Sequence, residues 1–328
     1  MQLRFPVNNR LVPVALSLGF LGCLAANQSI RAQTAASEQT VTSEPLVVTG
    51  EEVPSAYGAP PGFSRNRFSN LTNSYVLPPG AVYAGLIYQG DALRFNRPDH
   101  SLTQEIELGL PCRFGVAVEN RIENFRGRTQ ERTFSIEGRY ALADWNKIPL
   151  NPTIFVEYKF GIGHILHDEG PPVPLEKGEA QAFLDANKPL PDAFEVRLLL
   201  AQDFGENVEW ALNGFFEQEV GGDRGREAGF AQSFMIPIIL PRERLKVGAE
   251  MQFTSFTDVG IRDHPSYRVV IGPTIAWKPS KNTRLDISPL FGVTHDAPRA
   301  SVFVVFSMLF GPGGASEQAE APASTRNR

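Results

Sequence analysis

Four pairs of oppositely charged residues recur along the chain with a spacing of two. They are Glu119 and Arg121, Glu137 and Arg139, Glu157 and Lys159, and Glu195 and Arg197. Residues two apart in a β-strand face the same side. Each pair therefore places a carboxylate and a base on one face, where they can bind each other or a polar solute.

Further charged residues follow the same alternation with apolar neighbours, and together they predict one polar, inward face. The full predicted set is Glu105, Glu107, Glu119, Arg121, Glu137, Arg139, Glu157, Lys159, Glu195, Arg197, Glu209, Glu217, Lys246, Glu250, Arg268 and Arg284. Two interpretations stay open at this point. The set lines a conduit for polar solutes, or it forms a plug of mutual salt bridges that stabilises a narrow barrel.

Catalytic and metal-binding patterns are weak. Of the five histidines, only His100 has an adjacent serine, Ser101, and the nucleophile elbow and acid expected of a hydrolase are missing from the sequence around it. A metal site at His164, His167 and Asp168 would need three ligands from one loop. Phosphate-binding glycine loops, CxxC pairs and dinucleotide fingerprints do not occur. We therefore expect neither an enzyme nor a bound metal or cofactor, with an outer-membrane lipid hydrolase as the catalytic alternative.

Twelve segments alternate with period two and are bounded by turn residues, which predicts twelve β-strands. The predicted ranges are 81–89, 102–110, 114–122, 131–140, 152–163, 192–203, 208–219, 226–239, 243–256, 267–278, 283–293 and 299–310. Most are longer than the five or six residues usual in globular proteins, and they match the roughly nine to eleven that a tilted strand needs to cross a bilayer.

The connections alternate in length. Those after even-numbered segments are mostly short, such as 111–113 and 279–282, with 141–151 as the exception, whereas those after odd-numbered segments tend to be longer and more polar. Short turns at one end and long loops at the other are typical of outer-membrane barrels. All three tryptophans, Trp145, Trp210 and Trp277, fall near the short-turn end, which predicts an aromatic girdle at that interface.

The N-terminal region, 1–32, is predicted to be a cleaved secretory signal. Arg4 and Arg10 precede an apolar stretch from Leu11 to Ala26, and small residues follow it. A membrane anchor is the alternative, but about sixteen apolar residues are fewer than the roughly twenty needed to span. Cys23 adds a lipoprotein alternative, because Leu21-Gly22-Cys23 resembles a lipobox.

Residues 33–80 are predicted to be a partly disordered periplasmic arm, and 312–328 a disordered tail. Within the arm, Pro45 to Gly50 (PLVVTG) resembles the energy-coupling box of TonB-dependent transporters. The alternative is an apolar segment that docks on the periplasmic mouth or enters the lumen. Removal of 1–32 takes three of the thirty-one bases and no acid, which leaves twenty-eight against thirty-six. That balance excludes a nucleic-acid partner.

Over about residues 81–311 the chain resembles Gram-negative outer-membrane β-barrels of the porin-like class. The resemblance rests on the signal, the GLPCRFG hairpin and the last strand VFVVFSMLF, which ends in an aromatic residue. It implies an all-β, antiparallel transmembrane barrel of about twelve strands in the outer membrane, with lipid, small polar solutes and the barrel-insertion machinery as partners. The expected function is a channel or uptake porin, with a structural or adhesive barrel as the alternative.

Overall fold

A computed structural model describes residues 75–92, 98–125, 127–165, 188–205, 208–222, 224–239, 244–257, 262, 264–280 and 282–311. Twelve strands account for most of them. The strands are β1 (Val82–Ala92), β2 (Asp99–Leu110), β3 (Phe114–Phe125), β4 (Arg128–Ala141), β5 (Thr153–Gly161), β6 (Ala193–Phe204), β7 (Val208–Glu219), β8 (Arg226–Ile239), β9 (Leu245–Thr257), β10 (Ser266–Trp277), β11 (Thr283–Gly292) and β12 (Ala300–Phe310). No helix among the described residues is long and apolar enough to cross a membrane.

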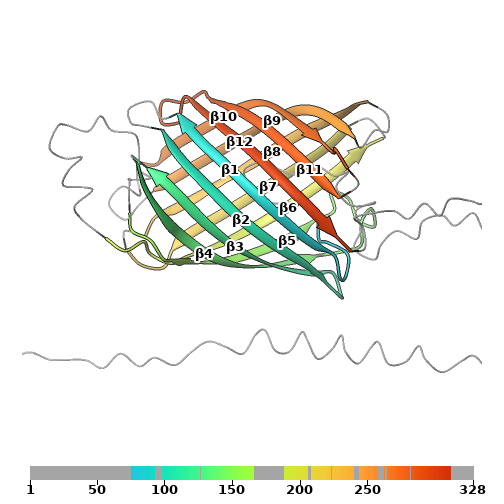
Figure 1. Ribbon diagram of the computed structural model, residues 1–328, viewed down its shortest axis with the longest axis horizontal. Helices are drawn as coiled ribbons and strands as arrows, with labels where there is room; N and C mark the ends of the chain where they lie inside the picture. Colours follow the sequence, from blue (N-terminus) through green and yellow to red (C-terminus); the bar gives the residue numbers. More distant parts are fainter. Residues whose placement is uncertain are drawn as a thin grey trace, which may run out of the picture. The chain divides into compact units, whose positions relative to one another are not determined.

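The strands form one closed antiparallel barrel in chain order (Figure 1). Each strand pairs with its neighbours in sequence, and β1 closes the ring against β12 in a continuous register from Val82 opposite Phe310 to Ala92 opposite Ala300. Closure satisfies the backbone groups of both terminal strands, so that no free sheet edge remains. The predicted fold class and the predicted strand number are confirmed.

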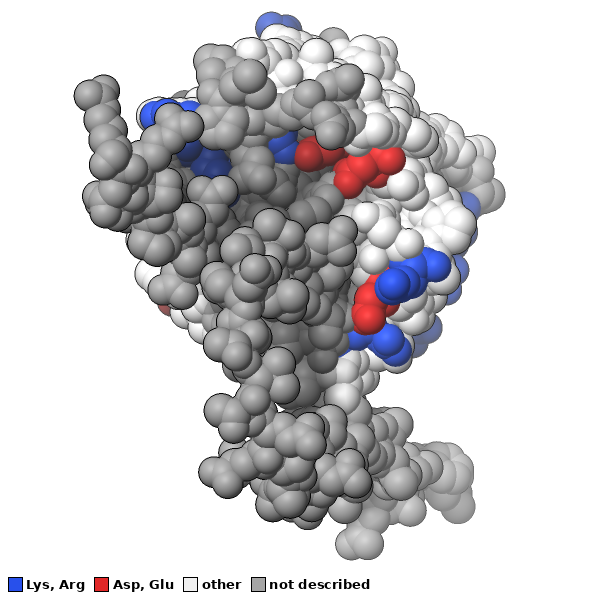
Figure 2. Space-filling view, turned by 90° about the vertical axis from the view of Figure 1, so that its right-hand side faces the viewer, with Lys and Arg blue, Asp and Glu red and all other residues white. Residues whose placement is uncertain are grey.

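The outer wall of the barrel is apolar. Alternate residues on each strand are exposed and hydrophobic, for example Ile106, Ile136, Val156, Leu198 and Ile271. Figure 2, which looks at the end where β1 begins and β12 ends, shows charged side chains in a few separate groups and large uncharged stretches of wall. Water would penalise an apolar surface of this extent, whereas acyl chains would not.

The two ends of the barrel differ. We call the end with connections 111–113, 142–152, 205–207, 240–244 and 278–282 the turn end, and the opposite end the loop end. The connection between β3 and β4 at the loop end is only 126–127, because both strands run several residues beyond their predicted limits. The predicted long loop at this position is therefore wrong.

The turn between β2 and β3 has an unusual backbone. Cys112 and Arg113 both adopt positive φ, at 62° and 64°. Positive φ is uncommon for residues other than Gly, Asn and Asp. The two residues let the three-residue connection 111–113 reverse the chain between the paired Leu110 and Phe114, as the predicted hairpin requires.

The predicted aromatic girdle holds for only some of its members. Phe114, Trp277 and Phe310 are exposed on the outer wall near the turn end. Trp145, in contrast, is buried among apolar residues that include the inward-facing Ala201. Its place in the girdle was wrong, because the 142–152 connection directs this side chain away from the lipid-facing surface.

Candidate solute pathway

All sixteen charged residues predicted to face inward lie on strands, on the face opposite the exposed apolar side chains. Their burial ranges from full, as for Glu107, to partial, as for Glu217. The register then brings residues from different strands together, which no single segment of sequence reveals.

Five adjacent strands carry glutamates that are paired in register, in a row that climbs from β4 toward the loop end at β8. Glu137, Glu157, Glu195, Glu217 and Glu227, on β4 to β8, are direct cross-strand partners in succession. We call these five residues the glutamate row. Like charges placed directly opposite each other destabilise a sheet unless bases intervene.

Arg139 supplies the first of these bases. Its guanidinium nitrogens lie 2.7 Å from a carboxylate oxygen of Glu107, 2.8 Å from Glu137 and 3.2 Å from Glu105. The side chains of Arg139, Glu105 and Glu107 have no exposed area. One guanidinium therefore holds three carboxylates in a dry environment, where breaking the contacts is costly.

Lys159 and Arg197 bind the next part of the glutamate row. The Lys159 ammonium donates to Glu195 at 2.8 Å and to Glu217 at 2.6 Å, and it lies 3.7 Å from Glu157. Arg197 donates from Nε to Glu195 at 2.5 Å. Lys159 lies on the loop-end side of the row and Arg197 on its turn-end side.

A buried aromatic ring links the two arginines. Phe155 lies between them in register, and its ring centroid is 5.4 Å from the Arg139 guanidinium carbon and 4.5 Å from that of Arg197. Cation–π contacts of this kind orient a planar guanidinium. Phe155 thereby keeps both bases facing the glutamate row.

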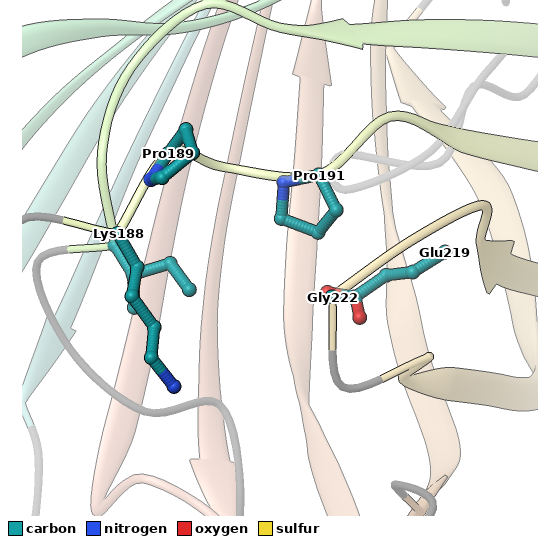
Figure 3. A pocket seen from close by; sticks show the side chains of 6 residues that line it. Lys188, Pro189, Pro191, Glu219 and Gly222 are labelled. Atoms are coloured by element: carbon teal, nitrogen blue, oxygen red, sulfur yellow. The ribbon is translucent and has the colours of Figure 1, made fainter. Parts of the chain in front are cut away.

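The exposed fraction of the side chain differs among the charged residues between Arg139 and the loop end. It is 0% for Arg139, 10% for Arg197, 21% for Lys159 and 28% for Glu217. A pocket of about 220 Å³ lies farther along, lined by Ile165, Lys188, Pro189, Pro191, Glu219 and Gly222. Figure 3 shows Lys188 and Glu219 on opposite sides of it. Water thus reaches the charged face from the loop end.

Elsewhere on the inner face the charges pair more simply. Lys246 lies 2.6 Å from Glu209, and Arg284 lies 2.7 Å from Asp286. The hydroxyl of Ser288 donates to Thr274 at 2.6 Å beside these pairs. The side of the barrel formed by β9 to β12 is thus nearly balanced in charge, unlike that formed by β2 to β8.

Sequence reasoning missed several inward-facing charges. They include Asp91, Asp99, Glu123, Arg132, Glu227 and Asp286. The same alternation could have found Glu123, because it continues the phase of Glu119 and Arg121 in a strand that was predicted to end too early. A bulge in β4 interrupts the alternation and turns Arg132 inward, so that alternation alone does not predict its position. Its Nη1 atom lies 2.6 Å from Oε2 of Glu123.

Three carboxylates meet that the sequence did not group. Glu105 and Glu119 are cross-strand partners, and oxygen atoms of both lie within 4.8 Å of one another and of an oxygen of Glu137. The three come from β2, β3 and β4. Their proximity adds to the negative charge near Arg139.

The turn end of the lumen is filled by apolar side chains. One contact cluster contains Tyr75, Leu77, Ala81, Tyr83, Trp145, Ala201, Ala211, Ala231 and Leu309. We call it the apolar closure. Its strand residues come from β12 and β1 and from β6 to β8, which lie on opposite sides of the ring, so the cluster crosses the bore. The PLVVTG segment, whose docking was an alternative in the arm, lies outside the described residues.

The segment before β1 supplies three members of this closure, Tyr75, Leu77 and Ala81. Tyr75, Val76 and Leu77 are almost fully buried. The backbone passes so close to Gly109 that a Cβ there would lie 2.1 Å from the carbonyl oxygen of Pro78. Glycine is therefore required at this position for the chain to enter the lumen. Val76 lies against Gly115, whose other neighbours include Glu107 and Arg139, so that this segment shields the Arg139 cluster from water.

The candidate hydrolase residues are not brought together. His100 and Ser101 are consecutive in β2, so that they face opposite sides of the wall: Ser101 is buried, and its hydroxyl lies 3.4 Å from Arg121, while His100 is exposed, with Nδ1 2.9 Å from the Tyr88 hydroxyl. They cannot act as a nucleophile and base on one substrate. His167 and Asp168 lie outside the described residues.

A closed barrel with an apolar exterior and a charged interior is the architecture of outer-membrane β-barrel proteins. No family model matches the chain, and no curated protein matches it. Solved structures of similar fold include an outer membrane channel from Pseudomonas putida F1 (12% identity, 72% of this chain and 97% of that one, TM-score 0.48). Others are the NanC porin (8% identity, 70% and 99%, TM-score 0.43) and the KdgM porin (10% identity, 70% and 99%, TM-score 0.44).

Proposed function

We propose that this protein is an outer-membrane channel for small polar solutes. The observation that carries the proposal is the inner face of the barrel, where the charged side chains of Arg197, Lys159 and Glu217 are partly exposed although they lie inside the ring of strands. A barrel that served only as a scaffold would need no exposed polar surface in its interior. The loop end is then extracellular and the turn end periplasmic.

A second candidate is a structural barrel with a filled lumen. The complete burial of Arg139, Glu105 and Glu107, together with the apolar closure, favours it. The two candidates share a fold and differ in one measurable property, which is the passage of ions and solutes.

Single-channel recording in planar bilayers separates the two. The full chain and a variant that carries Tyr75→Ala and Leu77→Ser are both reconstituted, since these side chains occupy the turn end of the bore. Discrete conductance steps in either protein support a channel. If both proteins insert in the folded form and neither conducts, the structural barrel is correct and the channel proposal is wrong.

The remaining assignments complete the proposal. Residues 1–32 act as a secretory signal, 33–80 as a periplasmic arm and 312–328 as a tail, and the barrel-insertion machinery assembles 81–311 in the outer membrane. We propose no catalytic activity, because His100 and Ser101 face opposite sides of β2. A lipid hydrolase assay on the purified protein, with His100→Ala as the comparison, tests this point.

A further inference from the structure

The inner face carries an excess of negative charge. The sixteen predicted residues comprise nine acids and seven bases. The structure adds one base and seven acids, which are the five named above together with Asp203 and Glu219, so that sixteen acids face eight bases. The excess lies on the side formed by β2 to β8. The inner face of β9 to β12 carries three bases, Lys246, Arg268 and Arg284, and two acids, Glu250 and Asp286. The one extra base on this side does not offset the negative excess on β2 to β8.

Fixed carboxylates in a tube with low-dielectric walls raise the local concentration of cations and repel anions. Rings of Asp and Glu side chains select cations in other channels for this reason. Here the glutamate row crosses five neighbouring strands, and its bases, Arg139, Lys159 and Arg197, are each shared by two or more carboxylates. The bases orient the carboxylates without cancelling their charge.

From this geometry we propose that the solutes of the channel are cations, such as small amines and hydrated metal ions. The inference rests on the proposed channel function and names its substrate class. Glu227, the second residue of β8, and the partly exposed Glu217 are the members of the glutamate row nearest the loop end, and such a solute meets them first. An anionic solute meets the same carboxylates and is excluded.

Reversal potentials in a KCl gradient test the proposal on whichever of the two reconstituted proteins conducts. We expect K⁺ to permeate about tenfold better than Cl⁻, at the lower end of the enrichment that focused fields produce. Glu217→Gln combined with Glu227→Gln should lower the ratio toward one. Glu131→Gln is the matched control, because Glu131 is exposed on the outer side of β4 and its loss leaves the lumen unchanged.

The outcomes separate the two levels of the proposal. If the conductance is anion-selective or unselective, the cation inference is wrong and the channel proposal stands. The same holds if the double variant leaves the ratio of K⁺ to Cl⁻ permeability unchanged. Absence of conductance in both proteins overturns the channel itself. A fall in the ratio for the Glu131 control equal to that of the double variant would also overturn the inference, because the effect would then not come from the lumen.

The apolar closure independently carries a second inference. Tyr75 and Leu77 come from the segment before β1, whereas Trp145 comes from the 142–152 connection, and all three meet inward-facing alanines across the bore. These side chains fill the turn end without being part of the strand ladder. We propose that the segment before β1 is a gate, which opens when it leaves the inner wall.

Gly109→Ala tests the gate, because the new methyl group would collide with the Pro78 carbonyl and displace the segment. We expect the open probability to rise relative to the unchanged chain. Gly214→Ala is the matched control, since a Cβ at Gly214 has no neighbour within 4 Å. The Tyr75→Ala and Leu77→Ser variant, which changes no strand residue, should give the same rise even if Gly109→Ala fails to fold. Unchanged gating in that variant overturns the inference.

Discussion

Arg139 is the side chain on which the interior of the barrel depends most directly. It is fully buried, contacts three carboxylates from β2 and β4, and packs over Phe155. Because the carboxylates are also buried, its removal would leave negative charges together in a dry site. The same residue therefore links the fold with the electrostatics of the proposed pathway.

We expect Arg139→Met to lower the free energy of unfolding by about 3–5 kcal/mol, the usual cost of breaking a buried ion pair. Urea unfolding followed by the shift in gel mobility measures it. Arg226→Met is the control, since Arg226 is exposed and its side chain donates a hydrogen bond to the exposed side of Gln218 at 3.1 Å, and we expect a loss of less than about 0.5 kcal/mol. Equal losses in both variants would contradict the burial of the Arg139 cluster.

Members of the glutamate row should differ in their effect on stability. Glu137 accepts a hydrogen bond from Arg139 at 2.8 Å, whereas Glu157 lies 3.7 Å from Lys159 and 3.6 Å from Arg197. Glu137→Gln should therefore cost about 1.5–3 kcal/mol, as for a hydrogen bond to a charged group, and Glu157→Gln should cost less, because no hydrogen bond of this length to a base is lost. Thermal unfolding of the two single variants gives the comparison, and a reversed order would show that these distances do not govern the energetics.

At the scale of the strand, alternation decides which substitutions the barrel tolerates. Leu198 on β6 is exposed on the outer wall, and Val247 on β9 shares that side. Their neighbours in sequence face the charged interior. An arginine placed on the two faces of one strand therefore meets either acyl chains or polar groups.

Leu198→Arg, in the middle of β6, should cost about 2–4 kcal/mol, and Val247→Arg, the third residue of β9 from the turn end, should cost less because it lies nearer the interface. Gln252→Arg, on the inner face of β9, should be much milder. Glu195 is unsuitable as a second inner-face control, although alternation alone would suggest it, because Glu195 binds both Lys159 and Arg197. Folding in lipid vesicles at increasing urea measures the difference, and equal costs on both faces would contradict the assignment of the outer wall.

For the molecule as a whole, closure of β1 against β12 predicts resistance to detergent. The described residues form one ring without a free edge. We expect the mature protein in the outer-membrane fraction, with a faster gel mobility before boiling than after it. Recovery in the soluble periplasmic fraction, or a mobility that boiling does not change, would contradict a membrane-embedded barrel.

The alternation of the sequence by itself determined the number of strands, their two faces and the inward position of all sixteen predicted charges. Such patterns are local, because successive side chains of a strand must point to opposite sides. Two strand ends differ from the prediction: β3 and β4 extend past Ile122 and Glu131, where polar residues continue the ladder to a short hairpin. The turn between Leu110 and Phe114 agrees with the predicted connection 111–113, although neither Cys112 nor Arg113 favours the positive φ that it adopts there.

Only the tertiary structure decided which charges meet. The glutamate row depends on the register of five strands, and that register is fixed by hydrogen bonds and turn geometry between segments far apart in sequence. The apolar closure depends equally on distant contacts, since Tyr75 and Trp145 carry no sequence signal that distinguishes the lumen from a lipid interface. Both aromatic rings are amphipathic and suit either environment, and the backbone path past Gly109 places Tyr75 inside.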